Sequence, residues 1–387
     1  MKDFIYSYPT KVYFGDGAAE KAFSAEMTKI GKTVMLAYGG GSVKKNGVYD
    51  EICGHLRKAG KEIVDFSGIM SNPTYAKVQE GAALVREKGV DFILAVGGGS
   101  VIDCCKIIAA QAVTEKDIWK MEFEEHVYPT EYLPMGAVVT ASGTGAEMNN
   151  GAVITNEDTK EKAGVLGAYA SFAILDVGYT MSLPAKQVIS GAFDTLSHSM
   201  ETYLGSPREI NLSDEIGEAV MRNVIRNIRI LLTDMNNKGA RTELMWASAM
   251  AENGILKIGK VTDFQAHQIE HQLGAYTDCN HGQGLAVIHP VLYRHMYKDG
   301  VKQFARLAEK VWEIPSEGKT EEELAEAGVN ALADFVKEIG MPTTFTEMGL
   351  TDKSVLKKVA NTCNLTAGCC KKLFREEVLD ILEECWE

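Results

Sequence analysis

The stretch DFILAVGGGSVIDCCKIIAAQAV (residues 91–113) decides the fold class of this chain. Its first part, DFILAVG (91–97), is a short apolar run that predicts a buried strand, and VIDCCKIIAAQAV (101–113) predicts a helix. Two further strand–helix units precede it, TVMLAYG with GVYDEICGHLRKAG, and EIVDFSG with PTYAKVQEGAALVREKG. Three units at a spacing of about 30 residues predict a parallel sheet with helices packed on its faces.

The pattern changes beyond Leu183–Pro184. Before this point LPMGAVVT and AGVLGAYASFAILD add strand-like runs, whereas helical periodicity dominates after it. The helical runs are AKQVISGAFDTLSHSMETYL (185–204), DEIGEAVMRNVIRNIRILLTDM (214–235), RTELMWASAMAENGILKIG (241–259) and VKQFARLAEKVWEI (301–314). We therefore predict two domains, an α/β domain over residues 1–184 and a helical domain over residues 185–387.

Composition narrows the function classes. The 387 residues are 45% hydrophobic and carry a formal net charge of −13, which disfavours binding to nucleic acid or to an anionic membrane. The start, MKDFIYSYPT, lacks an apolar leader segment, and no stretch approaches the roughly 20 apolar residues that cross a bilayer. The eight cysteines are scattered or adjacent, as in Cys104–Cys105 and Cys369–Cys370, which indicates reduced thiols. We expect a cytoplasmic protein.

Two glycine-rich turns follow predicted strands. In the first, Gly97, Gly98 and Gly99 would let the backbone approach a phosphate at the start of the next helix, although a tight turn without a ligand has the same pattern. The second turn, YGGGSVKKNG (38–47), ends the earlier strand TVMLAYG. It contains three glycines, then a hydroxyl and two cations: Gly39, Gly40, Gly41, Ser42, Lys44 and Lys45.

The second turn bears on the choice of cofactor. The hydroxyl and the two lysines suit the 2′-phosphate of NADP better than the 2′-hydroxyl of NAD, although a solvated basic loop is the alternative interpretation. A third loop, VVTASGTGAEMNN (138–150), offers Thr140, Ser142 and Thr144 to phosphate or ribose, or is only a turn. The sequence thus predicts a bound dinucleotide, NADP before NAD.

Histidines and one aspartate form a second pattern. Asp194 and His198 lie one helical turn apart in GAFDTLSHSMETYL (191–204), and DFQAHQIEHQLGAYTDCNHG (263–282) adds His267, His271 and His281. Any single histidine can be a satisfied core residue. An aspartate with three histidines, however, offers three nitrogens and one oxygen to a divalent metal ion, with Fe2+ and Zn2+ both compatible.

These segments carry a family resemblance. GGGSVIDCCK, TASGTGAE, LPAKQVISGAFDTLSHSMETY and HQIEHQLGAYTDCNHGQGLAVIHP resemble the iron-containing (group III) alcohol dehydrogenases, and YGGGSVKKNGVYD with SNPTYAKV resembles their NADPH-preferring butanol dehydrogenase and aldehyde reductase branch. The resemblance implies a Rossmann-like dinucleotide-binding domain, an all-helical domain, an active site in the cleft between them, and a homodimer. It implies hydride transfer between NADP(H) and small primary alcohols or aldehydes, with the metal as Lewis acid.

Carried over position by position, the resemblance assigns individual roles. The implied metal ligands are Asp194, His198, His267 and His281, while His271 would relay a proton or orient a ligand. The implied cofactor contacts are Asn72, Gly98, Gly99, Ser100, Asp103, Thr140, Thr144 and Lys162.

Several alternatives stay open at this point. Glu201 and Glu270 could accept hydrogen bonds from ligand imidazoles, but we favour the interpretation that they are solvated helix-face carboxylates. A cyclase of the dehydroquinate synthase type shares the predicted architecture, and an NAD-dependent glycerol or diol dehydrogenase is a second relative. A non-haem iron oxygenase or a non-catalytic metal-binding protein would leave the glycine turns without a role. The predicted metal-binding helices are flanked by apolar residues, which suit small apolar alcohols better than the acidic substrate of such a cyclase: Phe193, Met200, Phe264 and Leu273.

Overall fold

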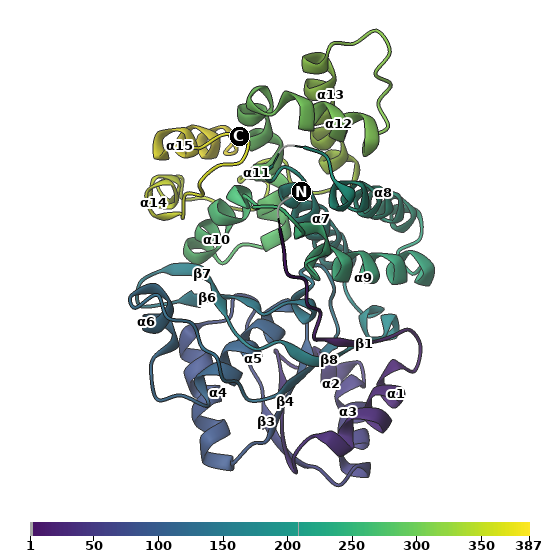
Figure 1. The fold of residues 1–387 in the computed structure, drawn as a ribbon, viewed down its shortest axis with the longest axis vertical. Coiled ribbons are helices and arrows are strands. Elements are labelled where there is room, and N and C mark those ends of the chain that lie inside the picture. The colour runs from purple at the N-terminus through teal and green to yellow at the C-terminus, as the bar shows by residue number, and fades with distance from the viewer. Residues whose placement is uncertain (1–2, 208) are drawn as a thin grey trace. The chain divides into compact units, whose positions relative to one another are not determined.

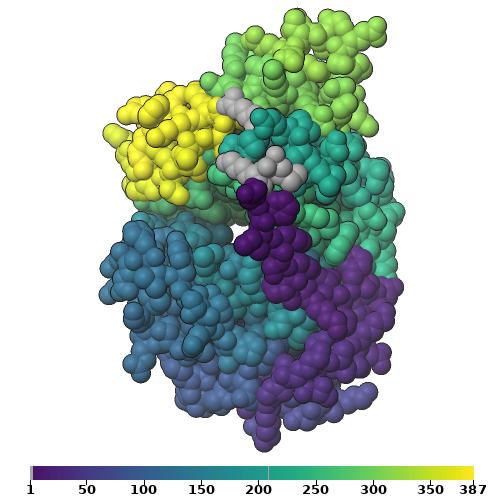
Figure 2. Space-filling model, in the orientation of Figure 1, coloured from purple at the N-terminus to yellow at the C-terminus, as the bar shows by residue number. Residues whose placement is uncertain are grey.

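The computed structural model describes residues 3–207 and 209–387, which separate into two compact units (Figure 1). One unit is Ser7–Pro184, and the other comprises Ala185–Glu387 together with the first described residues up to Tyr6. Figure 2 shows these first residues at the surface, where Ile5 is 98% exposed. Among the described residues, no helix is both long enough and apolar enough to span a membrane.

The Ser7–Pro184 unit is built on a parallel sheet, as the strand–helix repeats predict. Its six strands lie in the order β1-β8-β5-β4-β2-β3, and every pair is parallel. The strands are β1 (Lys11–Phe14), β2 (Thr33–Tyr38), β3 (Glu62–Phe66), β4 (Phe92–Gly97), β5 (Met135–Val139) and β8 (Ala170–Leu175). Strands β6 (Gly151–Asn156) and β7 (Glu161–Leu166) form a separate antiparallel hairpin.

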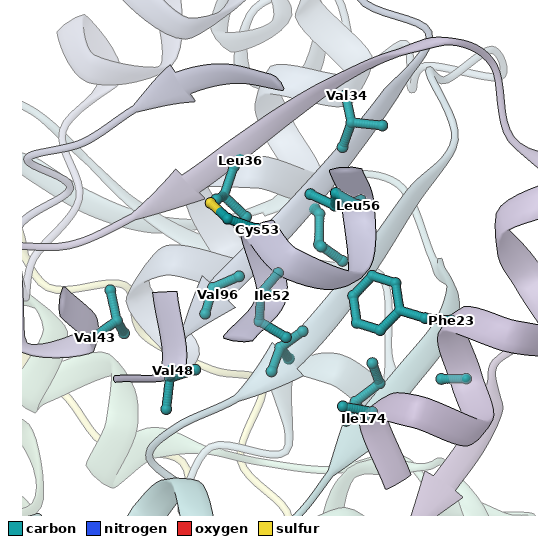
Figure 3. Close-up of a cluster of buried hydrophobic side chains, with 14 of the residues drawn as sticks. Phe23, Val34, Leu36, Val43, Val48, Ile52, Cys53, Leu56, Val96 and Ile174 are labelled. Atoms are coloured by element: carbon teal, nitrogen blue, oxygen red, sulfur yellow. The ribbon is translucent and has the colours of Figure 1, made fainter. Parts of the chain in front are cut away.

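Helices cover both faces of this sheet, which explains why its central strands are continuously apolar (Figure 1). The helices are α1 (Ala18–Glu26), α2 (Ser42–Lys45), α3 (Val48–Lys58), α4 (Tyr75–Lys88), α5 (Gly99–Gln111) and α6 (Ile118–Phe123). On one face, Phe23 of α1 and Ile52 and Leu56 of α3 pack against alternate strand residues such as Leu36 and Val96 (Figure 3).

The order of the strands places a topological switch point between β2 and β4. From β2 the chain moves to β3 on one side, then crosses to β4 on the other side and continues to β5 and β8. In open α/β sheets, ligands bind at the carboxyl ends of the strands on either side of such a point. The glycine turns that follow β2 and β4 lie at this position.

The second unit is a helical assembly. Its helices are α7 (Ala185–Tyr203), α8 (Leu212–Thr233), α9 (Lys238–Glu252), α10 (Gln265–Thr277), α11 (His281–Met296), α12 (Val301–Lys310), α13 (Glu321–Glu338), α14 (Val355–Thr362) and α15 (Arg375–Glu384). Helix α7 is buried on all sides from Ala192 to Tyr203, as expected of a central helix. The two-part architecture, α/β followed by helical, agrees with the sequence-based prediction.

Two predicted helices end earlier than their periodicity indicates. The run 241–259 was expected to be helical throughout, but α9 ends at Glu252, because Asn253 is followed by Gly254 with a φ of 87°. The run 301–314 likewise stops at Lys310, shortly before Glu313, which has a φ of 56°. In both runs, apolar residues after the helix end still pack inward and imitate helical spacing.

Candidate active site

Three helices carry the predicted metal ligands within the helical unit. Asp194 and His198 lie on the buried helix α7, His267 lies near the start of α10, and His281 is the first residue of α11. The four-residue spacing of Asp194 and His198 puts both side chains on one face of α7. The structure therefore brings all four residues, which are distant in sequence, into one cluster.

The cluster is centred on one oxygen. Asp194 Oδ1 lies 3.8 Å from His198 Nε2, 3.5 Å from His267 Nε2 and 3.4 Å from His281 Nε2. Ligand atoms of Asp194, His267 and His281 all lie within 4.8 Å of one another. Three imidazole nitrogens and one carboxylate oxygen thus face a common point, an arrangement suited to a divalent transition-metal ion.

The hydrogen bonding of these donor atoms fits a metal ion as well. Asp194 Oδ1 and His267 Nε2 are buried, and neither atom makes a hydrogen bond within the described part of the chain. Buried polar atoms are costly to leave without a partner, and nearly all such atoms in native proteins have one. The residues present therefore fit a cation bound between them.

Buried glutamates orient two of the histidines from behind, which corrects the interpretation of Glu201 and Glu270 as solvated carboxylates. Glu201 and Glu270 are only 4% and 0% exposed. Glu201 accepts a hydrogen bond from His267 Nδ1, and Glu270 accepts one from His281 Nδ1. This bond fixes the tautomer and directs each Nε2 towards Asp194, as in many metal sites.

A third glutamate, which the sequence did not single out, stands behind His198. Glu252, at the end of α9, lies 3.8 Å from His198 Nδ1, and its other oxygen pairs with Lys257 at 2.8 Å. Each of the three histidines thus has a buried carboxylate on its Nδ1 side. No spacing rule connects Glu252 with His198, because the two residues lie on different helices.

The electrostatics of the cluster require a positive charge. Burial lowers the pKa of His267, but the carboxylates of Glu201 and Asp194 outweigh that effect and raise the pKa to about 10. Burial raises the pKa of Glu201, but His267 reverses the effect and leaves that pKa below its ordinary value. Several buried carboxylates meet in this cluster, so either a proton or a metal cation must offset their charge.

The loop before α11 positions His281. Asn280 caps this helix by accepting a hydrogen bond from the Gln283 backbone N–H, 3.1 Å away, and it also accepts one from Ser190 Oγ of α7 at 2.5 Å. A Cβ atom at Gly282 would collide with the Ser190 carbonyl oxygen, so only glycine allows this close approach. These contacts hold the first turn of α11 against α7.

His271 lies beside the cluster rather than in its centre. Its ring is 5.8 Å from that of His267 and 5.5 Å from that of His281, between ring centroids. It also forms a second group of possible metal-binding residues with Glu270 and His281. This position is compatible with both expected roles, as a proton relay and as an orienter of a ligand.

One of the four predicted apolar residues, Phe264, packs its half-buried ring on the metal-site histidines. Phe264 precedes α10, and its ring lies 5.8 Å from that of His198 and 5.1 Å from that of His267. Phe193, Met200 and Leu273 are buried, as are Asp194, His198 and His267 of the cluster. The preference for small apolar alcohols that these four residues indicate stays a prediction.

The glycine turns of the α/β unit adopt the expected strand–turn–helix form. Gly97 ends β4, Gly98 precedes α5, and Gly99 begins it. A Cβ atom at Gly99 would overlap the Thr144 side chain, and one at Gly97 would lie 2.5 Å from Val101. Glycine is therefore required here for close packing as well as for the approach of a ligand.

The second turn lies at the end of the neighbouring strand β2. Gly39 and Gly40 follow this strand, and Gly41, with a φ of 99°, precedes the short helix α2. Ser42, Lys44 and Lys45 form α2 together with Val43, and the two lysines are exposed.

The other predicted cofactor residues surround these turns. Ser100 Oγ donates a hydrogen bond to the Ser71 carbonyl oxygen and so holds the segment containing Asn72 against α5. Thr140 follows β5, and its N–H donates to the Gly97 carbonyl oxygen at 2.9 Å. Thr144 contacts the first turn of α5, and Lys162 is buried on β7 opposite Thr155.

Asp103 has protein partners for both carboxylate oxygens. One oxygen accepts a hydrogen bond from the Val153 N–H at 2.9 Å, and the other lies 3.4 Å from Lys106 Nζ. Lys106 is fully buried and also donates to Asn149 Oδ1 at 3.0 Å and to the Gly151 carbonyl oxygen at 2.6 Å. Asp103 and Lys106 thus hold the β6–β7 hairpin, which carries Lys162, against α5.

Comparison with known proteins agrees with this arrangement over the whole chain. Residues 9–177 match the family model described as iron-containing alcohol dehydrogenase, and residues 188–386 match the C-terminal model of the Fe-containing alcohol dehydrogenase family. The chain is 38% identical over 387 residues to the probable NADH-dependent butanol dehydrogenase 1 of Bacillus subtilis (strain 168), covering 99% of both chains.

Two further relatives are similar over nearly their full length. The chain is 35% identical over 366 residues to the NADPH-dependent aldehyde reductase YqhD of Escherichia coli (strain K12), covering 93% of each. The crystal structure of NADH-dependent butanol dehydrogenase A from Thermotoga maritima superimposes with a TM-score of 0.93 at 36% identity, covering 100% of this chain and 99% of that one. The chain therefore belongs to the iron-containing alcohol dehydrogenase family and is an oxidoreductase, as its resemblance to that family implies.

Proposed function

We propose that this protein is a metal-dependent alcohol dehydrogenase or aldehyde reductase that transfers hydride between NADP(H) and small primary alcohols or aldehydes such as butanol and butanal. The observation that carries the proposal is the convergence of three histidine Nε2 atoms on Asp194 Oδ1, at 3.4–3.8 Å. The bound ion is proposed to be Fe2+ or Zn2+, because both accept this donor set.

The chain's own residues supply binding, orientation and proton transfer. Asp194, His198, His267 and His281 would hold the ion, and Glu201 and Glu270 keep two of the imidazoles in the ligating tautomer. When bound, the ion acts as a Lewis acid on the alcohol or aldehyde oxygen, and the nicotinamide accepts or supplies the hydride. His271 is proposed to exchange a proton with that oxygen.

The glycine turns are proposed to bind the dinucleotide at the switch point of the sheet. The turn at Gly97–Gly99 would receive the pyrophosphate, because the first N–H groups of α5 are directed there. Ser42, Lys44 and Lys45 favour NADP over NAD. The named relatives include both NADH- and NADPH-dependent enzymes, so the preference rests on these residues.

Cofactor oxidation by the purified protein tests the proposed reaction directly. The metal is removed with a chelator, Fe2+ (without oxygen) or Zn2+ is added back, and the oxidation of NADPH and of NADH with butanal is followed. We expect turnover only with metal, and faster with NADPH. The variant His267→Ala should bind less than one metal ion per chain and show no turnover. Lys319→Met, an exposed change outside the site, should behave as the parent.

Other outcomes separate the alternatives. Faster turnover with NADH would retain the dehydrogenase and overturn the proposed role of the two lysines. The absence of turnover with any metal, while metal and dinucleotide both bind, would favour a cyclase of the dehydroquinate synthase type, which returns its cofactor to the starting oxidation state.

We also propose that the protein is a cytoplasmic homodimer. The net charge of −13 supports a protein without nucleic-acid or membrane partners. Sedimentation velocity of the purified chain tests the assembly, and a mass of one chain at micromolar concentration would overturn it.

A further inference from the structure

A cluster around Asp65 borders the glycine turn that follows β2. Asp65 lies on β3 beside Leu36 of β2. Its carboxylate accepts hydrogen bonds from Tyr38 Oη at 2.7 Å, from Tyr49 Oη at 2.9 Å, and from Lys44 Nζ at 3.5 Å. We call these four residues the Asp65 cluster, and the sequence patterns had singled out only Lys44 among them.

Lys44 is held by aromatic rings as well as by Asp65. Its ammonium group lies 4.9 Å from the ring centroid of Tyr38 and 4.4 Å from that of Tyr49, so both rings make cation–π contacts with it. Lys45, the next residue, is also exposed, but no other described residue forms a hydrogen bond or an ion pair with its ammonium group. Of the two lysines that favour NADP, Lys44 therefore already has protein partners, whereas the ammonium group of Lys45 is available to a ligand.

The cluster is fixed in position next to the glycine turn. Tyr38 is buried in the core, so the hydroxyl that it offers to Asp65 is anchored by the sheet. The segment after β3 is bonded to the turn itself, because the Gly68 N–H donates to the Gly39 carbonyl oxygen at 3.1 Å. The side chains of Asp65 and Lys44 are 44% and 47% exposed, which leaves both accessible to a ligand.

The charge of Asp65 acts differently on the two dinucleotides. A 2′-phosphate carries roughly one and a half to two negative charges, so it gains from a cation and loses from a nearby carboxylate. The 2′-hydroxyl of NADH is neutral and requires neither lysine. A carboxylate that already binds Lys44 therefore weakens NADPH binding selectively.

We propose that Asp65 determines dinucleotide specificity: by engaging Lys44 beside Tyr38 and Tyr49, it lowers the affinity of this turn for a 2′-phosphate. The proposal rests on the proposed dinucleotide site. Lys45 and Ser42 still favour NADPH over NADH, and Asp65 limits the ratio of the two affinities. The neutral replacement Asp65→Asn keeps the shape of the side chain and an oxygen that accepts hydrogen bonds from the tyrosine hydroxyls. It removes the negative charge that competes with a 2′-phosphate for Lys44.

Calorimetric titration with NADPH and with NADH tests the proposal without any need for turnover. The proteins are the parent, Asp65→Asn, Lys44→Met, the double variant, and Glu20→Gln, which loses one charge on the exposed start of α1. We expect Asp65→Asn to tighten NADPH binding by about threefold to tenfold at low salt and to change NADH binding by less than about twofold. The gain should shrink in the Lys44→Met background, and Glu20→Gln should change neither affinity.

Three results would overturn the proposal. The first is an unchanged ratio of the two affinities in Asp65→Asn, and the second is an equal change for both dinucleotides. The third is an undiminished gain in the Lys44→Met background, which would assign the effect to direct repulsion alone. Binding of neither dinucleotide would overturn the site together with the role of Asp65, whereas binding without turnover of any aldehyde would count only against the proposed reaction.

Discussion

The orientation of His267 depends on one buried carboxylate, that of Glu201. The carboxylate accepts bonds from His267 Nδ1 and from the Ala266 N–H, so it fixes both the ring and the first turn of α10. Glu201→Gln can still accept a hydrogen bond but lacks the charge that strengthens the imidazole as a ligand. We expect metal affinity to fall by about 10- to 100-fold.

Competition with a calibrated chelator measures this loss. Glu383→Gln, an exposed change on α15, is the matched control and should leave the affinity as in the parent. Unchanged metal affinity in Glu201→Gln would show that the hydrogen bond suffices and that the charge has no influence on the ligand.

His271 provides a second test at the scale of a single residue. If it relays a proton, His271→Ala should lower kcat by about 100- to 10,000-fold while the metal content stays stoichiometric. Stopped-flow measurement of kcat across pH, together with elemental analysis, gives both quantities. A variant that loses its metal would instead assign His271 to orienting the ligands, and a variant with full metal and full turnover would exclude both roles.

Among the elements, the β6–β7 hairpin depends on a buried carboxylate of α6. The Leu166 N–H of β7 donates to both oxygens of Glu122, at 3.1 and 3.0 Å. Burial raises the pKa of Glu122 to about 7 from its ordinary 4.5, and the Leu166 N–H offsets only part of that rise. Between these two values the unfolded chain has released a proton that the folded chain retains.

The free energy of unfolding is therefore expected to decrease as the pH rises from about 4.5 to 7, and Glu122→Gln should remove this contribution. Urea unfolding of both proteins at several pH values across that range measures the two slopes. Equal slopes would mean that Glu122 ionises equally in the folded and unfolded chains.

The elements also show which parts of the fold were accessible from sequence. The strands β2 and β4 follow from the sequence because each is a buried, continuous apolar run. The shorter and only partly buried strand β3 follows from its place between two runs with helical periodicity. Strand β1 has four residues, is only partly buried, and pairs with β8, so no local pattern marks it. The ligands on α7 and α10 were identifiable because their spacing lies within a single helix, whereas Glu252 and Asp65 act on residues of other elements.

At the scale of the whole molecule, the two units should respond to different ligands. All four candidate metal ligands belong to the helical unit, and both glycine turns belong to the Ser7–Pro184 unit. A ligand present at 100 times its Kd stabilises the folded state that binds it by about 2.7 kcal/mol. Chelation is therefore expected to lower the unfolding temperature of the helical unit.

Differential scanning calorimetry with and without a chelator checks this expectation. Addition of NADPH to the metal-free protein is the complementary control, since it should raise the transition of the α/β unit. A single transition that shifts equally with either ligand would indicate that the two units unfold together.

The order of the supporting glutamates along the chain has a practical consequence. Glu201 lies on α7 and orients the histidine of α10, and Glu270 lies on α10 and orients the histidine of α11. Helices α7 and α10 thus each orient the ligand histidine of the next ligand-bearing helix. A protein engineer who wishes to transplant this centre into another scaffold must move all three helices as one block, since a graft of the four ligands alone would leave two imidazoles free to rotate.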